Sequence, residues 1–130
     1  MYTIGTAAKK TDMPTKTIRY YADIRLVTPV GRSEKGYRLY DDRALRRLIF
    51  VRRARAFGFS VETCRNLLAL YSDQSRASAH VKAIALNHLS EIDAKLRELQ
   101  TLRDELARLA NTCAGDDRAD CPILTGFAAT

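Results

Sequence analysis

Two cysteines near the C-terminal end are the residues whose spacing most directly suggests a chemical role. Seven residues lie between Cys113 and Cys121, and Gly115 and Pro122 indicate a loop rather than a helix. A loop of this length can bring two sulfur atoms together. Because no His and no second close Cys pair lie nearby, four-coordinate structural zinc is poorly supported. Two thiolates suit a soft monovalent ion such as Cu(I), which accepts few ligands and prefers sulfur.

The spacing alone leaves other interpretations of the pair open. The two thiols could form a redox disulfide, or they could be unrelated. The third cysteine, Cys64, lies on the apolar side of an expected helix, where a free cysteine is usually a small buried hydrophobe. An odd number of cysteines also argues against a disulfide framework. The chain shows no nucleophile–base constellation, so we do not expect an enzyme.

The segment before this loop predicts a long helix that needs a partner. From Ala79 to Ala110 the chain contains no Pro and no Gly, which predicts one helix of about 48 Å. Its apolar residues alternate at spacings of four and three, a heptad seam that only Arg103 interrupts. We expect the partner for this seam to be the same helix of a second copy. The seam positions are Ala85, Leu89, Ile92, Leu96, Leu99, Arg103, Leu106 and Ala110.

The charge of the chain is divided unevenly between its two halves. Residues 1–60 hold 14 Lys and Arg against 5 Asp and Glu, a net +9, whereas residues 61–130 hold 8 against 10, a net −2. The sum is the overall +7. This asymmetry suggests a polyanion-binding module joined to a different element. No apolar run is long enough to span a membrane, and the absence of a charged-then-apolar leader predicts a cytoplasmic protein.

The basic half begins with two short helices and a hairpin. Ile4 to Thr11 and a segment from Pro14 to about Ile24 read as helices with a tight turn between them, a helix-turn-helix pattern. The second helix would enter the major groove of DNA, with Thr15, Lys16 and Arg19 on a polar face. Residues 30–40 predict a small β wing, because β-forming residues follow a Gly-containing turn. Its Arg32, Lys35 and Arg38 suit phosphate contacts.

Two further helices complete the N-terminal half. Asp41 is a good N-cap for a helix over residues 42–57, which Gly58 ends, and Ser60 caps another over 61–71. We expect Leu45, Leu48, Ile49 and Phe57 to form the buried stripe of the first of them. The prediction is therefore a mainly α chain. It has a winged helix-turn-helix domain over 1–72, a connector and dimerisation helix over 73–110, and a metal-binding loop and tail over 111–130.

Several blocks of this sequence resemble the MerR family of transcription regulators. They are residues 2–5 (YTIG), 17–21 (TIRYY), 27–29 (VTP), 32–40 (RSEKGYRLY) and 56–60 (AFGFS), followed by the long helix. The loop from Cys113 to Pro122 is similar to that of the copper-sensing (CueR/HmrR-like) branch. The resemblance implies a homodimer, built on an antiparallel coiled coil, that binds promoter DNA. It also implies that Cys113 and Cys121 bind one Cu(I), Ag(I) or Au(I) per subunit.

The same resemblance assigns roles to other residues. In the mercury- and zinc-sensing branches a cysteine near the start of the dimerisation helix is a further ligand from the other subunit; here that position is Ser78, which favours monovalent metal. Lys82 matches a residue that offsets the negative charge of two thiolates. The family acts on RNA polymerase at the promoter, because metal binding distorts the DNA between two elements. The implied DNA-binding residues are Thr15, Lys16, Arg19 and Tyr20 in the helix and Arg32, Lys35, Tyr37 and Arg38 in the wing.

The chain departs from the family pattern at two helix ends. Asp12 and Arg25 stand where the family usually has glycine. Asp tolerates a left-handed backbone moderately well and Arg does so at a cost, so the turn after the second helix could differ from the family's. Within this fold, a thiol-redox regulator with a Cys113–Cys121 disulfide is the alternative function.

Overall fold

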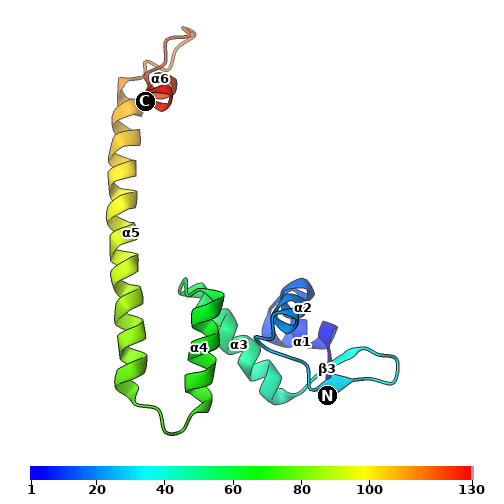
Figure 1. Cartoon of the computed structure of the whole chain (residues 1–130). Coiled ribbons are helices and arrows are strands. Elements are labelled where there is room, and N and C mark those ends of the chain that lie inside the picture. Colours follow the sequence, from blue (N-terminus) through cyan, green and yellow to red (C-terminus); the bar gives the residue numbers. More distant parts are fainter. Residues whose placement is uncertain (130) are drawn as a thin grey trace. The chain divides into compact units, whose positions relative to one another are not determined.

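The computed structural model describes residues 1–129, which form two compact units. Unit 1 comprises Met1–Val81, and unit 2 begins at Lys82. Helices dominate both units, and a three-stranded sheet is the β structure of unit 1 (Figure 1). The mainly α fold expected from the sequence is confirmed. In residues 1–129, no helix has the length and apolar character that crossing a membrane requires.

Unit 1 opens with the two helices of the helix-turn-helix. Helix α1 spans Ile4–Thr11, and the Thr3 side chain caps it by accepting a hydrogen bond from the Thr6 amide. Helix α2 spans Thr15–Asp23 and starts directly after Pro14, whose missing N–H costs nothing there. Ile18 and Tyr21 of α2 are buried, as their spacing predicts.

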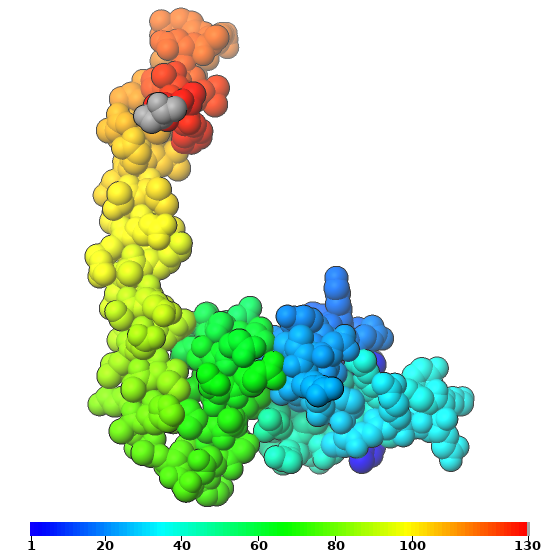
Figure 2. Space-filling model, viewed as in Figure 1, coloured from blue at the N-terminus to red at the C-terminus, as the bar shows by residue number. Residues whose placement is uncertain are grey.

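The wing is part of a small antiparallel sheet. Strands β2 (Gly31–Arg32) and β3 (Arg38–Tyr40) form the hairpin, with Arg32 opposite Arg38. Strand β1 (Tyr2–Thr3) pairs with the other edge of β3 and places Tyr2 opposite Tyr40. Strand β1 was not predicted from the sequence, because two residues carry no periodicity of their own. In the space-filling view the wing, in cyan, protrudes from the body of unit 1 (Figure 2).

Helix α3 (Asp42–Ala56) packs against α1 and the sheet, and α4 (Val61–Ser72) packs against α3. The caps are those expected, because the Asp41 carboxylate accepts from the Ala44 amide and the Ser60 hydroxyl accepts from the Thr63 amide. The core contains Ile18, Tyr40, Leu48, Val51, Cys64 and Leu68, each at most 2% exposed. The expected burial of Phe57 is wrong, since its side chain is 70% exposed at the end of α3.

Unit 2 contains most of α5 (Ser78–Thr112) and all of α6 (Pro122–Ala128). The continuous long helix is confirmed, and its seam residues Leu89, Leu96, Leu99 and Leu106 are each more than half exposed. Helix α6 was not predicted, because the residues after α5 were expected to form a loop and tail. Pro122 starts this helix at its first position, where proline is favoured.

The two residues that stand where the family usually has glycine both adopt a backbone conformation that is typical of glycine. Asp12 and Arg25 have φ values of 56° and 59°, in the left-handed region. For a residue with a Cβ this conformation costs roughly 1–2 kcal/mol. The guanidinium of Arg65, on α4, donates to the carbonyls of Ile24 and Arg25 at 2.9 and 3.0 Å. This pair of hydrogen bonds fastens the end of α2 and holds the turn that Arg25 strains.

We expect Arg65→Met to lower the free energy of unfolding by about 1–3 kcal/mol, because two hydrogen bonds from a charged donor are lost. Urea denaturation at fixed protein concentration measures the change. Arg43→Met is the matched control, since Arg43 is exposed and its side chain has no hydrogen-bond partner within residues 1–129. An equal loss in both variants would contradict a fastening role for Arg65.

Candidate metal site and nucleic-acid surface

The structure brings the Cys113 and Cys121 sulfur atoms to 4.0 Å from one another. Cys113 directly follows the last residue of α5, and Cys121 directly precedes the first residue of α6. Both thiols are half-buried, and neither forms a disulfide. A metal–thiolate bond is about 2.3 Å long in zinc sites. One ion can therefore contact both sulfur atoms at this separation with little adjustment of the loop.

The electrostatic environment of Cys121 favours its thiolate form. The backbone amide of Leu124, in the first turn of α6, is the main influence that holds the pKa of this thiol below its usual value. The Ile123 amide and the nearby Cys113 side chain act in the same direction. A metal binds the thiolate rather than the thiol, so this lowering reduces the proton competition that an incoming ion meets.

Cys64 has the opposite environment. It is fully buried in the core of unit 1, and burial raises the pKa of its thiol. A neutral, water-excluded thiol is a poor ligand. The interpretation of Cys64 as a small buried hydrophobe is confirmed.

The donor set around the two sulfurs is small. Within residues 1–129, no group of three or more His, Cys, Asp and Glu side chains comes together as a metal site would require. The Asp116 carboxylate of the same loop is paired with the Arg118 guanidinium at 2.9 Å. Two sulfur donors suit a soft ion of low coordination number and do not complete the four-ligand shell of structural zinc.

The structure places Ser78 and Lys82 at the start of α5. Ser78 is the first residue of that helix, and Lys82 lies one turn further; both are exposed. Within unit 2, 30 residues separate Lys82 from the end of α5 at Thr112, or about 45 Å of helix. Lys82 is therefore remote from the thiols of its own chain, and no interaction between them exists inside one subunit.

The candidate DNA-binding residues of α2 share one accessible surface. Lys16, Arg19 and Tyr20 are exposed and Thr15 is half-buried, while Ile18 and Tyr21 face the core. Tyr20 keeps 52% of its surface exposed, with its ring centroid 5.9 Å from that of Tyr21. An exposed helix face with two cations and a phenol can reach base edges and phosphates.

The wing and α2 meet at one hollow of about 470 Å³. Arg19 from α2 and Arg32, Tyr37 and Arg38 from the wing line it together with Thr3, Ile4 and Gly36. Thr3 and Ile4 were not among the sequence-predicted residues, because only the pairing of β1 with β3 brings them here. Lys35 is exposed in the hairpin turn and does not line the hollow. Four of the eight DNA-binding candidates thus converge on one place.

Two of the wing arginines already have partners within the chain. Arg32 donates to the Gly36 carbonyl at 2.9 Å, which braces the hairpin turn. Arg38 forms an ion pair of 3.1 Å with Asp23, the last residue of α2. This pair ties the wing to the helix, so Arg38 positions the surface and its Nη2 atom is already engaged. Sequence reasoning could not find that contact, because 15 residues separate the two.

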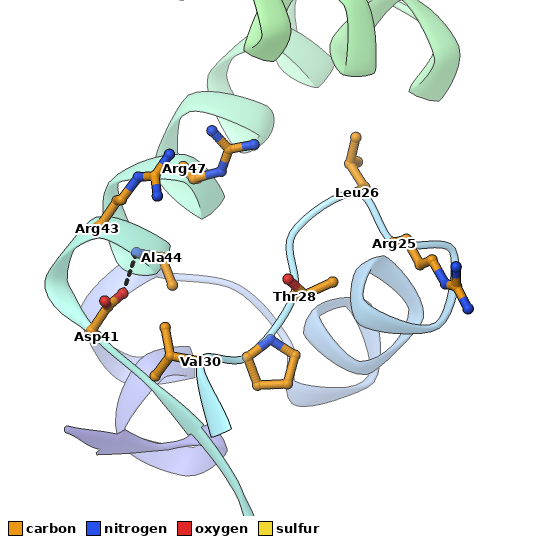
Figure 3. A pocket seen from close by; sticks show the side chains of 9 residues that line it. Arg25, Leu26, Thr28, Val30, Asp41, Arg43, Ala44 and Arg47 are labelled. Carbon is orange, nitrogen blue, oxygen red and sulfur yellow. Dashed lines mark hydrogen bonds between the residues drawn. The ribbon is translucent and has the colours of Figure 1, made fainter. Parts of the chain in front are cut away.

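Another hollow of unit 1 is strongly polar but lacks a convergent set of groups. It has a volume of about 420 Å³ and lies between the turn after α2 and the start of α3. Arg43 and Arg47 lie on its α3 side, where Asp41 caps the helix, whereas the Arg25 side chain points away from them (Figure 3). Its charged groups do not face a common point, so it offers no site for chemistry.

Comparison with known proteins identifies matches along nearly the whole chain. The family model of the MerR HTH family regulatory protein matches residues 2–70, and the model described as MerR, DNA binding, matches residues 45–109. The HTH-type transcriptional regulator HmrR of Rhizobium leguminosarum bv. viciae is 53% identical over 121 residues, 93% of each chain. The HTH-type transcriptional regulator CueR of Salmonella typhimurium is 47% identical over 121 residues, 93% of this chain and 88% of that one.

A solved structure extends the similarity to three dimensions. The transcription regulator PbrR691 from Ralstonia metallidurans CH34, crystallised in complex with lead(II), superposes with a TM-score of 0.82 at 34% identity. The match covers 98% of this chain and 99% of that chain. The similarity therefore includes the long helix and the residues after it, as well as the N-terminal unit.

Proposed function

Because the chain belongs to the MerR family of helix-turn-helix transcriptional regulators, which are not enzymes, we propose that it is a copper-responsive activator of this family. It binds promoter DNA as a homodimer and increases transcription by RNA polymerase of genes for efflux or detoxification of copper, silver or gold. The protein acts in the cytoplasm, where promoter and polymerase are found. The observation that carries the proposal is the pair of sulfur atoms 4.0 Å apart, without further donor clusters in residues 1–129.

Cys113 and Cys121 hold one Cu(I), Ag(I) or Au(I) per subunit. When bound, the ion supplies one positive charge between two thiolates and joins the two ends of the loop. The lowered pKa of Cys121 favours this ligand set, and its two-sulfur character favours monovalent over divalent ions. That the regulators named HmrR and CueR share about half of the residues of this chain supports the same metal class.

The dimer is built on α5, whose apolar seam has no partner of matching length in its own chain. Seven leucine and isoleucine side chains of α5 are at least 38% exposed. Because these side chains are already about half covered, burying the rest of each one stabilises the dimer by roughly 1 kcal/mol, less the entropy of association. In an antiparallel arrangement the start of one α5 lies beside the end of its partner, so Ser78 and Lys82 of one subunit come near the thiols of the other. Lys82 then offsets part of the negative charge of the thiolates.

DNA is held by the surface that α2 and the wing share. Arg19 contacts bases or phosphates, with Thr15, Lys16 and Tyr20 beside it, and Arg32, Lys35 and Tyr37 contact the backbone. Arg38 fixes the wing through Asp23 and lines the same hollow, although its Nη1 atom is buried. Metal binding biases the dimer between two states with different costs of DNA deformation, which switches the promoter.

A reporter experiment tests the metal class. An operator is selected from random duplexes with the purified protein and placed in a promoter that drives a reporter. We expect a response to copper, silver and gold salts and none to zinc or mercury, because Ser78 replaces the cysteine that the mercury- and zinc-sensing branches use as a further ligand, and a hydroxyl is a poor ligand for a soft ion. A response to zinc or mercury would contradict the copper assignment. A response to a thiol oxidant without metal would instead favour the disulfide switch.

A further inference from the structure

Leu109 is the one residue of α5 whose side chain is buried in this chain, at 6% exposed. The other leucines of this helix are each more than half exposed. What covers Leu109 is the backbone of α6, which lies beside the last turns of α5 (Figures 1 and 2). A Cβ atom built on Gly126 would lie 2.8 and 3.1 Å from the two methyl carbons of Leu109. The two helices are therefore in contact at a point where even a methyl group at position 126 would require the end of the Leu109 side chain to move.

Helix propensity does not explain a glycine at this position. Gly126 lies inside α6 without the positive φ that would require it, and glycine in a helix costs about 1 kcal/mol relative to alanine. The close approach to Leu109 is the physical gain that offsets this cost. It lets an apolar side chain be covered directly by the backbone of the neighbouring helix.

The contact joins a residue before Cys113 to a residue after Cys121, so that both thiols lie within a closed loop. Leu109 lies one turn before Cys113, and Gly126 follows Cys121 by five residues. A backbone hydrogen bond connects each cysteine to its helix. The Cys113 amide donates to the Ala110 carbonyl at 3.2 Å, and the Thr125 amide donates to the Cys121 carbonyl at 3.1 Å. The separation of the two sulfur atoms therefore depends on how α6 sits against α5.

We propose that Leu109 and Gly126 are positioning residues for the candidate metal site, and that their contact holds the Cys113 and Cys121 thiols at ligand distance before an ion arrives. This inference rests on the proposed metal function. It adds that the loop is closed in advance, so that binding does not have to supply the entropy of bringing its ends together. Substitutions that separate α6 from α5 lower the metal affinity although neither cysteine changes.

Exchanging the sizes of the side chains at positions 109 and 126 tests the contact, and the first readout needs no metal. In a Cys64→Ser background, Gly126→Leu, Leu109→Ala and the double variant are equilibrated with reduced and oxidised glutathione. Oxidation of the two protein thiols to a disulfide releases two protons and two electrons, which reduce one oxidised glutathione to two reduced molecules. The equilibrium constant reports how often the sulfur atoms meet. The Cu(I) affinity of each variant is then measured by competition with a chromophoric chelator under anaerobic conditions.

We expect Gly126→Leu to lower both the disulfide equilibrium constant and the Cu(I) affinity by about tenfold or more, since overpacking displaces α6. The double variant should recover to within about threefold of the parent, because alanine at position 109 makes room for the new side chain. Ala128→Leu, at an exposed position of the same helix, is the matched control and should change neither quantity. Circular dichroism verifies that each variant keeps its helical content.

The outcomes separate this inference from the metal function. An unchanged disulfide equilibrium in Gly126→Leu, or a double variant that loses as much as the two single variants together, would overturn the positioning role. If the disulfide constants follow the size exchange while the parent itself fails to bind Cu(I), the positioning role stands and the proposed function fails.

Discussion

Cys113→Ser is expected to reduce Cu(I) affinity by more than about 100-fold, because it removes one of only two sulfur ligands. Changes in outer-shell partners of a metal site already cost about 10- to 100-fold in affinity, and a direct ligand contributes more. A serine hydroxyl is a hard, neutral donor that does not replace a thiolate for a soft ion. The measurement is anaerobic competition with a chromophoric Cu(I) chelator on the fully reduced protein.

Two further cysteine variants are measured beside Cys113→Ser to show which thiols hold the ion. Cys121→Ser should cause a loss of the same order, since the two sulfur atoms lie 4.0 Å apart and act on one ion. Cys64→Ser should leave affinity unchanged, because that thiol is buried in the core of unit 1 with a raised pKa. Operator binding without metal should persist in all three. Parental Cu(I) affinity in Cys113→Ser would mean that the ion is held elsewhere.

Arg19→Ala is expected to weaken operator binding by about 10- to 100-fold, the effect of losing an arginine that contacts bases, about 1–3 kcal/mol. Arg19 is exposed on α2 and lines the hollow that the helix shares with the wing. Fluorescence anisotropy with a labelled operator at several salt concentrations measures both affinity and salt dependence. A contact to bases alters the sequence preference, whereas a phosphate contact weakens all sequences alike and lowers the salt slope by about one.

Arg97→Ala is the control for this experiment, since it removes the same charge from an exposed position in unit 2. It should leave DNA affinity within about twofold, because Arg97 is not part of the surface that α2 and the wing share. Arg19→Ala should still take up one Cu(I) per subunit, since the cysteines belong to the other unit. Undiminished operator affinity in Arg19→Ala would show that α2 is not the recognition helix.

The N-terminal fold was largely predictable because its signals act over a few residues. Asp41 and Ser60 each cap the helix that was expected, and Pro14 stands at the boundary between α1 and α2. The prediction was wrong for Phe57, whose position in the α3 stripe follows the period but which falls at the helix end. There the chain turns at Gly58, and the Phe57 ring stays 70% exposed.

The candidate sites were predictable in residue type but not in arrangement. The spacing of Cys113 and Cys121 allowed a shared ion, a disulfide or two unrelated thiols, and only the fold of the loop sets their separation. Arg38 was predicted as a phosphate contact, yet its ion pair with Asp23 also makes it a brace between wing and helix. Helix α6 was missed because seven residues are too few to show a helical period.

The order of helices α1 to α5, the heptad seam and the residue types of both surfaces followed from the amino-acid sequence alone, because caps, prolines and periodicity depend on neighbours a few positions away. The folded chain alone determined which sulfur, guanidinium and methyl groups come into contact. Arg65 with Arg25, Arg38 with Asp23, and Leu109 with Gly126 are separated along the chain by 40, 15 and 17 residues, respectively. Contacts at that range depend on how whole helices and strands pack, and no local pattern of residues specifies them.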